Sequence, residues 1–159
     1  MKLTTALAIT LVLATSPAHA SGSHAGGHDD LAVGKPGKPE KANRTVEVTM
    51  KETDDGKMLY EPASMKFKKG ETVRFIIKNA GETEHEFVLD THAKNQEHKA
   101  LMEKFPEMEH DDPNAIRLEE GASGEIVWTF SNTGTFEFAC LIPGHYESGM
   151  HGDVTIGAK

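Results

Sequence analysis

Apolar side chains recur at every second position in short stretches along most of the chain, which is the pattern of half-buried β-strands. Glycine, asparagine and serine clusters separate these stretches. The alternating apolar residues are Val46 and Val48; Met65 and Phe67; Val73, Phe75 and Ile77; Phe87 and Leu89; Ile116 and Leu118; Ile126, Trp128 and Phe130; Phe136 and Phe138; Val154 and Ile156. Seven or eight short strands at this spacing predict an all-β sandwich or barrel.

One segment, residues 91–113, lacks the alternation. Its apolar residues have helical spacing and lie among many charged residues. We therefore predict a short helix over Gln96–Phe105, in an excursion between two strands.

The first 42 residues contain no such strand pattern. Lys2 precedes an apolar run without acidic residues, and Ala18 and Ala20 have the spacing of a signal-peptide cleavage site. We predict a secretory signal peptide over residues 1–20; a retained membrane anchor is the alternative, although the run is too short to span a bilayer. Residues 21–42, rich in glycine and proline, are predicted to form a flexible tail, and residues 43–159 the folded domain.

Composition narrows the choice of partners. The net charge is −8, and loss of Lys2 with the signal peptide makes it −9 in a mature chain of 139 residues. Such an acidic protein is a poor ligand for nucleic acid or for an anionic membrane surface, so neither is expected as a partner. We expect an exported, periplasmic monomer without membrane insertion. A cationic protein surface would suit it better as a docking partner.

The chain has a single cysteine, Cys140. Exported proteins of this size often carry paired cysteines, and an unpaired thiol in an oxidising compartment is a liability unless it is buried or bound to a metal. Cys140, His145 and Met150 lie in one short stretch between two predicted strands. A thiolate, an imidazole and a thioether together favour copper over magnesium or calcium. Such copper sites usually take a second imidazole, and His85, at the start of a predicted strand, is the best candidate.

Several motifs together resemble the cupredoxin family. They are residues 69–75 (KGETVRF), residues 79–81 (NAG), residues 85–87 (HEF), and the pattern Cys-x4-His-x4-Met that begins at Cys140. The resemblance extends over roughly residues 46–156. It implies a Greek-key β-sandwich that binds one type 1 copper ion, cycling between Cu(I) and Cu(II), through His85, Cys140, His145 and Met150.

The chain departs from the family pattern after the first histidine. Where plastocyanin- and azurin-like proteins usually have asparagine, this sequence has Glu86. A carboxylate near the metal would favour Cu(II) and lower the reduction potential. The alternative is that Glu86 points to solvent, because neighbouring residues of a strand face opposite ways.

The remaining histidines of the mature chain are surplus to this ligand set and are candidates for weak additional metal binding or for ordinary surface positions. They are His24, His28, His92, His98, His110 and His151. This surplus, together with Glu86 and the acidic excursion, resembles the periplasmic cupredoxins of copper tolerance.

The sequence therefore leaves two candidate functions. The first is copper tolerance, in which the protein binds or buffers periplasmic copper; the alternative is an electron carrier that docks on a redox partner protein. An apolar surface formed by Leu141, Ile142, Pro143 and Tyr146 would suit a carrier. Four protein ligands leave no open position on the metal, so we do not expect an enzyme.

Overall fold

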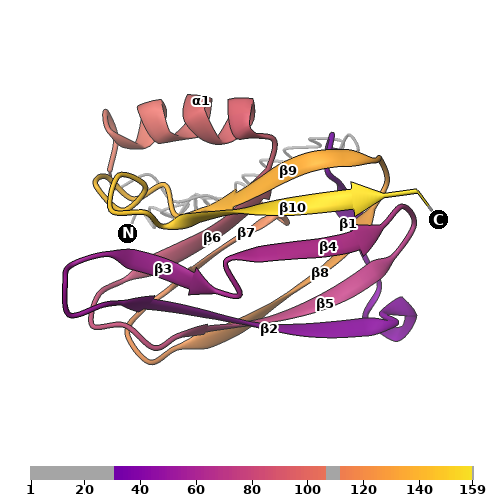
Figure 1. Ribbon diagram of the computed structural model, residues 1–159, viewed down its shortest axis with the longest axis horizontal. Helices are drawn as coiled ribbons and strands as arrows, with labels where there is room; N and C mark the ends of the chain where they lie inside the picture. The colour runs from indigo at the N-terminus through magenta and orange to yellow at the C-terminus, as the bar shows by residue number, and fades with distance from the viewer. Residues whose placement is uncertain (1–30, 107–111, 159) are drawn as a thin grey trace, which may run out of the picture.

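The computed structural model describes residues 31–106 and 112–158, and it consists of two packed β-sheets with one α-helix outside them (Figure 1). The first sheet has the strand order β1-β8-β5-β2-β3 and the second has the order β4-β10-β9-β6-β7. The strands are β1 (Gly34–Pro36), β2 (Arg44–Glu52), β3 (Met58–Glu61), β4 (Ser64–Lys68), β5 (Thr72–Asn79), β6 (His85–Asp90), β7 (Ala115–Leu118), β8 (Ser123–Phe130), β9 (Gly134–Ala139) and β10 (His151–Gly157). The predicted β-sandwich is confirmed.

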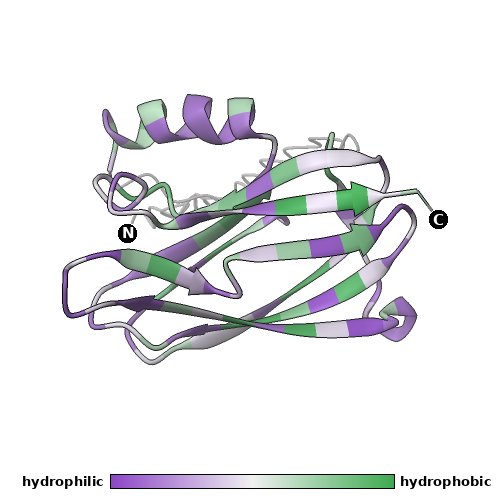
Figure 2. Ribbon diagram, viewed as in Figure 1, coloured by the Kyte–Doolittle hydropathy of each residue, from purple (hydrophilic) through white to green (hydrophobic). Residues whose placement is uncertain are grey.

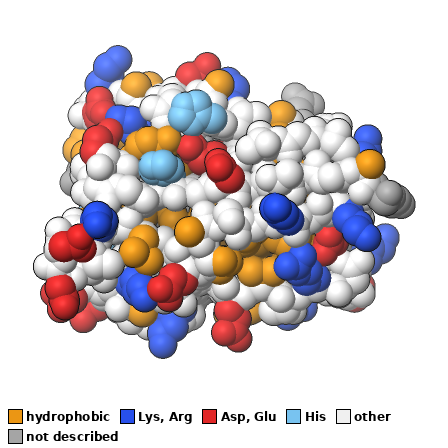
Figure 3. All heavy atoms as spheres, in the orientation of Figure 1, with side chains coloured by type: hydrophobic (Ala, Val, Ile, Leu, Met, Phe, Trp, Pro, Cys, Tyr) orange, Lys and Arg blue, Asp and Glu red, His pale blue; other side chains and the backbone are white. Residues whose placement is uncertain are grey.

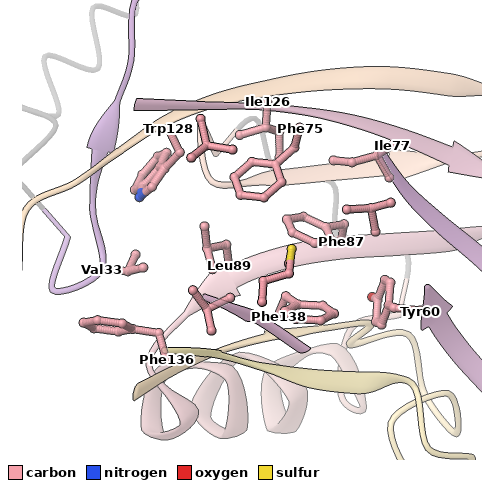
Figure 4. Close-up of a cluster of buried hydrophobic side chains, with 14 of the residues drawn as sticks. Val33, Tyr60, Phe75, Ile77, Phe87, Leu89, Ile126, Trp128, Phe136 and Phe138 are labelled. Atoms are coloured by element: carbon pink, nitrogen blue, oxygen red, sulfur yellow. The ribbon is translucent and has the colours of Figure 1, made fainter. Parts of the chain in front are cut away.

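The core lies between the two sheets and is formed by the alternate apolar residues of the strands (Figure 2). At one end Trp128 lies near Val33, and at the other Phe87, Phe138 and Tyr60 pack together (Figure 4). The rings of Phe87 and Phe138 are stacked with their centroids 5.6 Å apart. Burying such rings removes a large apolar area from water, which is the main force holding the sheets together.

Residues 31–42 differ from the expected flexible tail. Val33 is fully buried, and β1 pairs with β8 in antiparallel register, Lys35 opposite Thr129. A 3-10 helix, η1 (Pro39–Lys41), leads from β1 towards β2. The folded domain therefore begins before Asn43, because Val33 belongs to the core and β1 belongs to the first sheet. The predicted signal peptide lies outside the described residues.

The helix α1 (His92–Met102) begins four residues earlier than predicted and ends before Phe105. Its start is fixed by Thr91, whose side chain accepts a hydrogen bond from the Lys94 amide and so caps the first turn. Met102 is fully buried and Phe105 is exposed beyond the helix. In Figure 1, α1 lies outside the sandwich and covers the outer face of the second sheet beside β9.

Candidate metal centre

The strand pairing brings the four predicted ligands to one end of the sandwich. His85 is the first residue of β6, and β6 lies beside β9 with Val88 opposite Ala139. Cys140 follows β9 directly, and the chain then forms a loop, residues 140–150, before β10 returns antiparallel to β9. The Cys140 amide donates to the Met150 carbonyl at 3.0 Å, which closes the base of this loop. Residues 55 positions apart in sequence therefore lie side by side.

The 140–150 loop is a series of tight turns. The His145 amide donates to the Ile142 carbonyl at 3.0 Å, and the Met150 amide donates to the His145 carbonyl at 3.1 Å. Gly144 and Gly149 have φ angles of 89° and 99°, a region that side chains with a Cβ atom rarely adopt. These turns direct the side chain of His145 back towards Cys140.

Three of the predicted ligands form a cluster with the spacing of a metal site. The donor atoms of His85, Cys140 and His145 all lie within 4.8 Å of one another. The two histidine Nδ1 atoms are 3.2 Å apart, and the Cys140 Sγ atom is 3.4 Å from the His145 Nδ1 atom. Donors that share one ion through bonds of about 2.0–2.3 Å would be separated by similar distances. His85 and Cys140 are fully buried, whereas His145 is half-buried. The site thus has one edge near solvent.

Met150 is also fully buried, and its backbone is bonded to both Cys140 and His145. These bonds place Met150 at the base of the loop that carries Cys140 and His145. Its role as an axial ligand stays a prediction.

Burial raises the pKa of the Cys140 thiol to about 12 in the metal-free protein, although the backbone amides of Glu86 and Ile142 oppose the shift. The Glu86 amide nitrogen lies 3.4 Å from Sγ. The thiol is therefore protonated at neutral pH, and a metal that binds there must displace the proton. The same amide then becomes a donor to the thiolate.

Burial also lowers the pKa of both histidines. For His85 the carboxylate of Glu52 partly opposes the effect, and for His145 the charge of His85 adds to it. Both rings are therefore neutral at pH 7, which is the form that binds a metal.

Glu86 does not point to solvent, which corrects one of the two alternatives left open by the sequence. It is only 5% exposed, and its Oε2 atom accepts a hydrogen bond from the Leu141 amide at 3.4 Å. Glu86 thus ties β6 to the start of the 140–150 loop. Its neighbours on both faces of β6 are buried, because β6 lies inside the second sheet and α1 covers that sheet.

Sequence reasoning missed a second acidic residue beside the site. Glu52, the last residue of β2, has its Oε1 atom 2.9 Å from the Nε2 atom of His85. In the sequence Glu52 is one of several polar residues at the end of a strand, and its position contains no signal of this contact.

The other histidines do not form a second cluster within the described parts of the chain, where three or more metal-binding groups meet only at His85, Cys140 and His145. His92 contacts Glu137, and His151 stacks on Tyr146 with ring centroids 4.4 Å apart. In Figure 3, histidine side chains reach the surface on the same half of the molecule as the 140–150 loop, beside acidic side chains. His24, His28 and His110 lie outside the described residues.

Residues 46–157 match the family "Copper binding proteins, plastocyanin/azurin family". The chain belongs to this family. Its donor set fits the metal that the family is named for, because a thiolate with two neutral imidazoles in a largely buried pocket is a soft site of the kind that copper prefers. The cofactor is a type 1 copper.

Two relatives make the resemblance more specific. The chain is 52% identical over 140 residues to a copper-resistant cuproprotein, CopI, of Rubrivivax gelatinosus, a match that covers 87% of this chain and 81% of the relative. It is 35% identical over 174 residues to the CopI protein of Pseudomonas aeruginosa, with 91% of each chain covered.

Solved structures agree with the fold. Auracyanin B superimposes with a TM-score of 0.59 and 23% identity, covering 73% of this chain and 90% of the auracyanin. The auracyanin of Roseiflexus castenholzii gives a TM-score of 0.56 at 24% identity, with 73% and 98% covered. The predicted cupredoxin β-sandwich is thereby confirmed. No helix among the described residues has the length and apolar character needed to cross a bilayer.

Proposed function

We propose that this protein is a periplasmic copper-binding protein of copper tolerance, which holds one redox-active type 1 copper through His85, Cys140, His145 and Met150. The observation that carries the proposal is the convergence of two imidazoles and one thiol, all within 4.8 Å, at a buried end of the sandwich. The names of the relatives, copper-resistant cuproproteins, support the tolerance role.

The residues of the chain perform three tasks in this function. His85 and Cys140, both fully buried, hold the ion away from water, while the half-buried His145 forms its accessible edge. The hydrogen-bonded turns of the 140–150 loop direct His145 towards Cys140. When bound, the copper supplies a one-electron couple. A rigid donor set changes little between the two oxidation states, so the ion can be held in both.

We infer that the protein is not an enzyme. Four protein donors would leave no position on the ion for a substrate, which a catalytic metal needs. Some structures with the same fold are titled multicopper oxidase or nitrite reductase, but this chain covers less than half of each of those chains at 16% identity or lower. The likeness to them is one of fold alone.

The surface around His145 favours copper handling over electron transfer between proteins. A carrier docks through an apolar surface beside the exposed ligand, but of the four residues expected to form it only Pro143 is exposed; Ile142 and Tyr146 are half-buried and Leu141 is fully buried. Among the described residues the large apolar side chains that are exposed are Leu101 and Phe105, which belong to α1 and the segment after it. The electron carrier docking on a redox partner protein is therefore the second candidate.

The substitution Cys140→Ser tests the copper site. The wild-type protein loaded with Cu(II) should absorb strongly in the visible through charge transfer from the thiolate, and this absorption should be absent from the variant. The fold should be retained, as measured by circular dichroism. His151→Gln is the matched control, because it removes a nearby histidine that lies outside the cluster. A coloured Cys140→Ser protein, or a colourless His151→Gln protein, would refute the ligand assignment.

The tolerance role is tested in the host bacterium. Deleting the gene should slow growth on added copper, and the wild-type gene should restore growth whereas the Cys140→Ser gene should not. Equal rescue by both genes would contradict a role for the copper site. A respiratory defect without copper sensitivity would favour the carrier instead. N-terminal sequencing of the periplasmic fraction should give a chain that begins at Ser21.

A further inference from the structure

The imidazole ring of His85 has different neighbours at its two nitrogens. Its Nδ1 atom faces the Nδ1 atom of His145 at 3.2 Å, within the cluster of donors. Its Nε2 atom faces the Oε1 atom of Glu52 at 2.9 Å, on the opposite edge of the ring. This nitrogen is buried and has no well-aligned hydrogen bond to any group in the described part of the chain. The Glu52 carboxylate is therefore the acceptor available to it.

The position of the Glu52 carboxylate is fixed by the loop that precedes β6. Its Oε2 atom accepts from the Glu82 amide at 2.9 Å, and its Oε1 atom accepts from the Thr83 hydroxyl at 2.7 Å and the Thr83 amide at 3.2 Å. Gly81 makes room for it, since a Cβ atom at that position would lie 2.1 Å from Oε2 and 2.9 Å from the His85 Nε2 atom. Three donors and a glycine hold the carboxylate against the ring.

We propose that Glu52 is a positioning residue of the copper site, which accepts the Nε2 proton of His85, fixes Nδ1 as the metal-binding nitrogen and favours Cu(II) over Cu(I). This inference rests on the copper ligation proposed above. It adds a second acidic residue, from another strand, to the one that the sequence suggested: the Glu86 carboxylate accepts from the Leu141 amide, whereas the Glu52 carboxylate faces a ligand ring.

The physical basis is a chain of contacts in which the carboxylate accepts a proton of the imidazole and the imidazole binds the metal. A histidine that donates its second ring proton to a carboxylate is fixed in one tautomer and is a stronger electron donor to the metal. The more highly charged Cu(II) gains more from this than Cu(I) does. The Glu82 amide and the amide and hydroxyl of Thr83 all donate to the Glu52 carboxylate, and hydrogen bonds of this kind favour its ionised form.

The substitution Glu52→Gln tests the proposal because it keeps the shape of the side chain and removes its charge. We expect Cu(II) affinity to fall about tenfold relative to Cu(I) affinity. A tenfold change corresponds to an upward shift of the reduction potential of about 59 mV for a one-electron couple. The matched control is Glu47→Gln, which removes the same charge from an exposed position five residues earlier on the same strand, about 17 Å from Glu52. The control should leave the potential unchanged.

A second readout needs no copper. In the metal-free protein, the nitrogen chemical shifts of His85 should report a proton on Nε2 in the wild type and a mixture of tautomers in Glu52→Gln. Thr83→Val, which keeps the charge but removes one donor that orients it, should shift the potential in the same direction by a smaller amount.

The outcomes separate this inference from the proposed function. A wild-type protein that fails to bind copper would refute the function itself. A Glu52→Gln protein that binds coloured copper with an unchanged potential and an unchanged His85 tautomer would overturn the role of Glu52 alone. Lower thermal stability with an unchanged potential would show that Glu52 only fastens the loop at residues 82–83.

Discussion

The two faces of the β6–β9 pair are both buried, but they are built from different side chains. The inner face carries Phe87, Phe138 and, directly after β9, Cys140, all within the main core. The outer face carries Glu137 and Val88, and α1 covers it. The inner face surrounds the thiol with apolar groups, whereas the outer face holds a buried carboxylate that requires partners.

Those partners are three side chains from two elements. The carboxylate of Glu137 accepts hydrogen bonds from Asn95 at 2.9 Å, from the Tyr146 hydroxyl at 2.8 Å and from the His92 ring at 3.0 Å. Asn95 and His92 belong to α1 and Tyr146 to the 140–150 loop. The inner face therefore supplies stability and the environment of the sulfur, and the outer face attaches the helix to the ligand loop.

The largest effect should come from the inner face. Phe138→Ala should lower the free energy of unfolding of the metal-free protein by about 3–5 kcal/mol, because Phe138 is fully buried against Phe87 and Tyr60. Urea denaturation measures the loss. Phe105→Ala, at an exposed phenylalanine, is the control and should change stability by less than about 0.5 kcal/mol. A small loss at Phe138 would mean that the inner face is not the main source of stability.

A smaller effect is expected on the outer face. Glu137→Ala should cost about 1–3 kcal/mol, since the buried Asn95 amide and the part-buried Tyr146 hydroxyl lose their acceptor. It should also loosen the ligand loop, measured as faster amide hydrogen exchange at Tyr146. Glu137→Gln keeps an acceptor and should lose less. Equal exchange in Glu137→Ala and the wild type would show that α1 and the loop are independent.

The smallest effect concerns Asp90, the residue opposite Glu137 across the strand pair. Burial raises the pKa of Asp90, although the Thr91 amide opposes the shift. A raised folded-state pKa means that the ionised form is disfavoured by folding, so this destabilisation is complete above the folded pKa and disappears as the pH falls towards 3.8. Asp90→Asn should therefore stabilise the protein at pH 7 by less than about 1 kcal/mol and have no effect near pH 3.5, in thermal melts. Stabilisation of equal size at both values would assign the effect to something other than charge.

The contrast between the two faces also explains which parts of the fold and of the site could be predicted from the sequence. Strands with one exposed face, such as β5 and β8, show the alternation clearly, and the ligand loop was found because three unusual donor types lie within eleven residues. In β6, by contrast, five consecutive residues are buried. The alternation of apolar and polar residues cannot then show whether Glu86 is covered, because the cover is α1, which follows β6 directly and packs over the sheet.

The contact of Glu52 with His85 could not be predicted from the sequence for a different reason. Glu52 is 33 residues before His85 and lies at the end of a strand whose polar residues otherwise face solvent, so the contact depends on the register of β2 and on the path of the loop at residues 81–83. The short strands β1 and β3 were missed for a related reason. Each has only three or four residues, and pairing with a neighbour rather than its own pattern keeps it extended.

The parallel pairing of β10 with β4, which sets Val154 opposite Met65, has a consequence for the order of events in folding. Contacts between residues so distant in sequence form slowly, and β-sandwiches typically fold in milliseconds to seconds. The 140–150 loop is closed at its base when β10 pairs with β9, so Cys140 and His145 should not meet His85 in their final arrangement in a partly synthesised chain. We expect tight copper capture to await the docking of this strand, which makes the metal a reporter of complete folding.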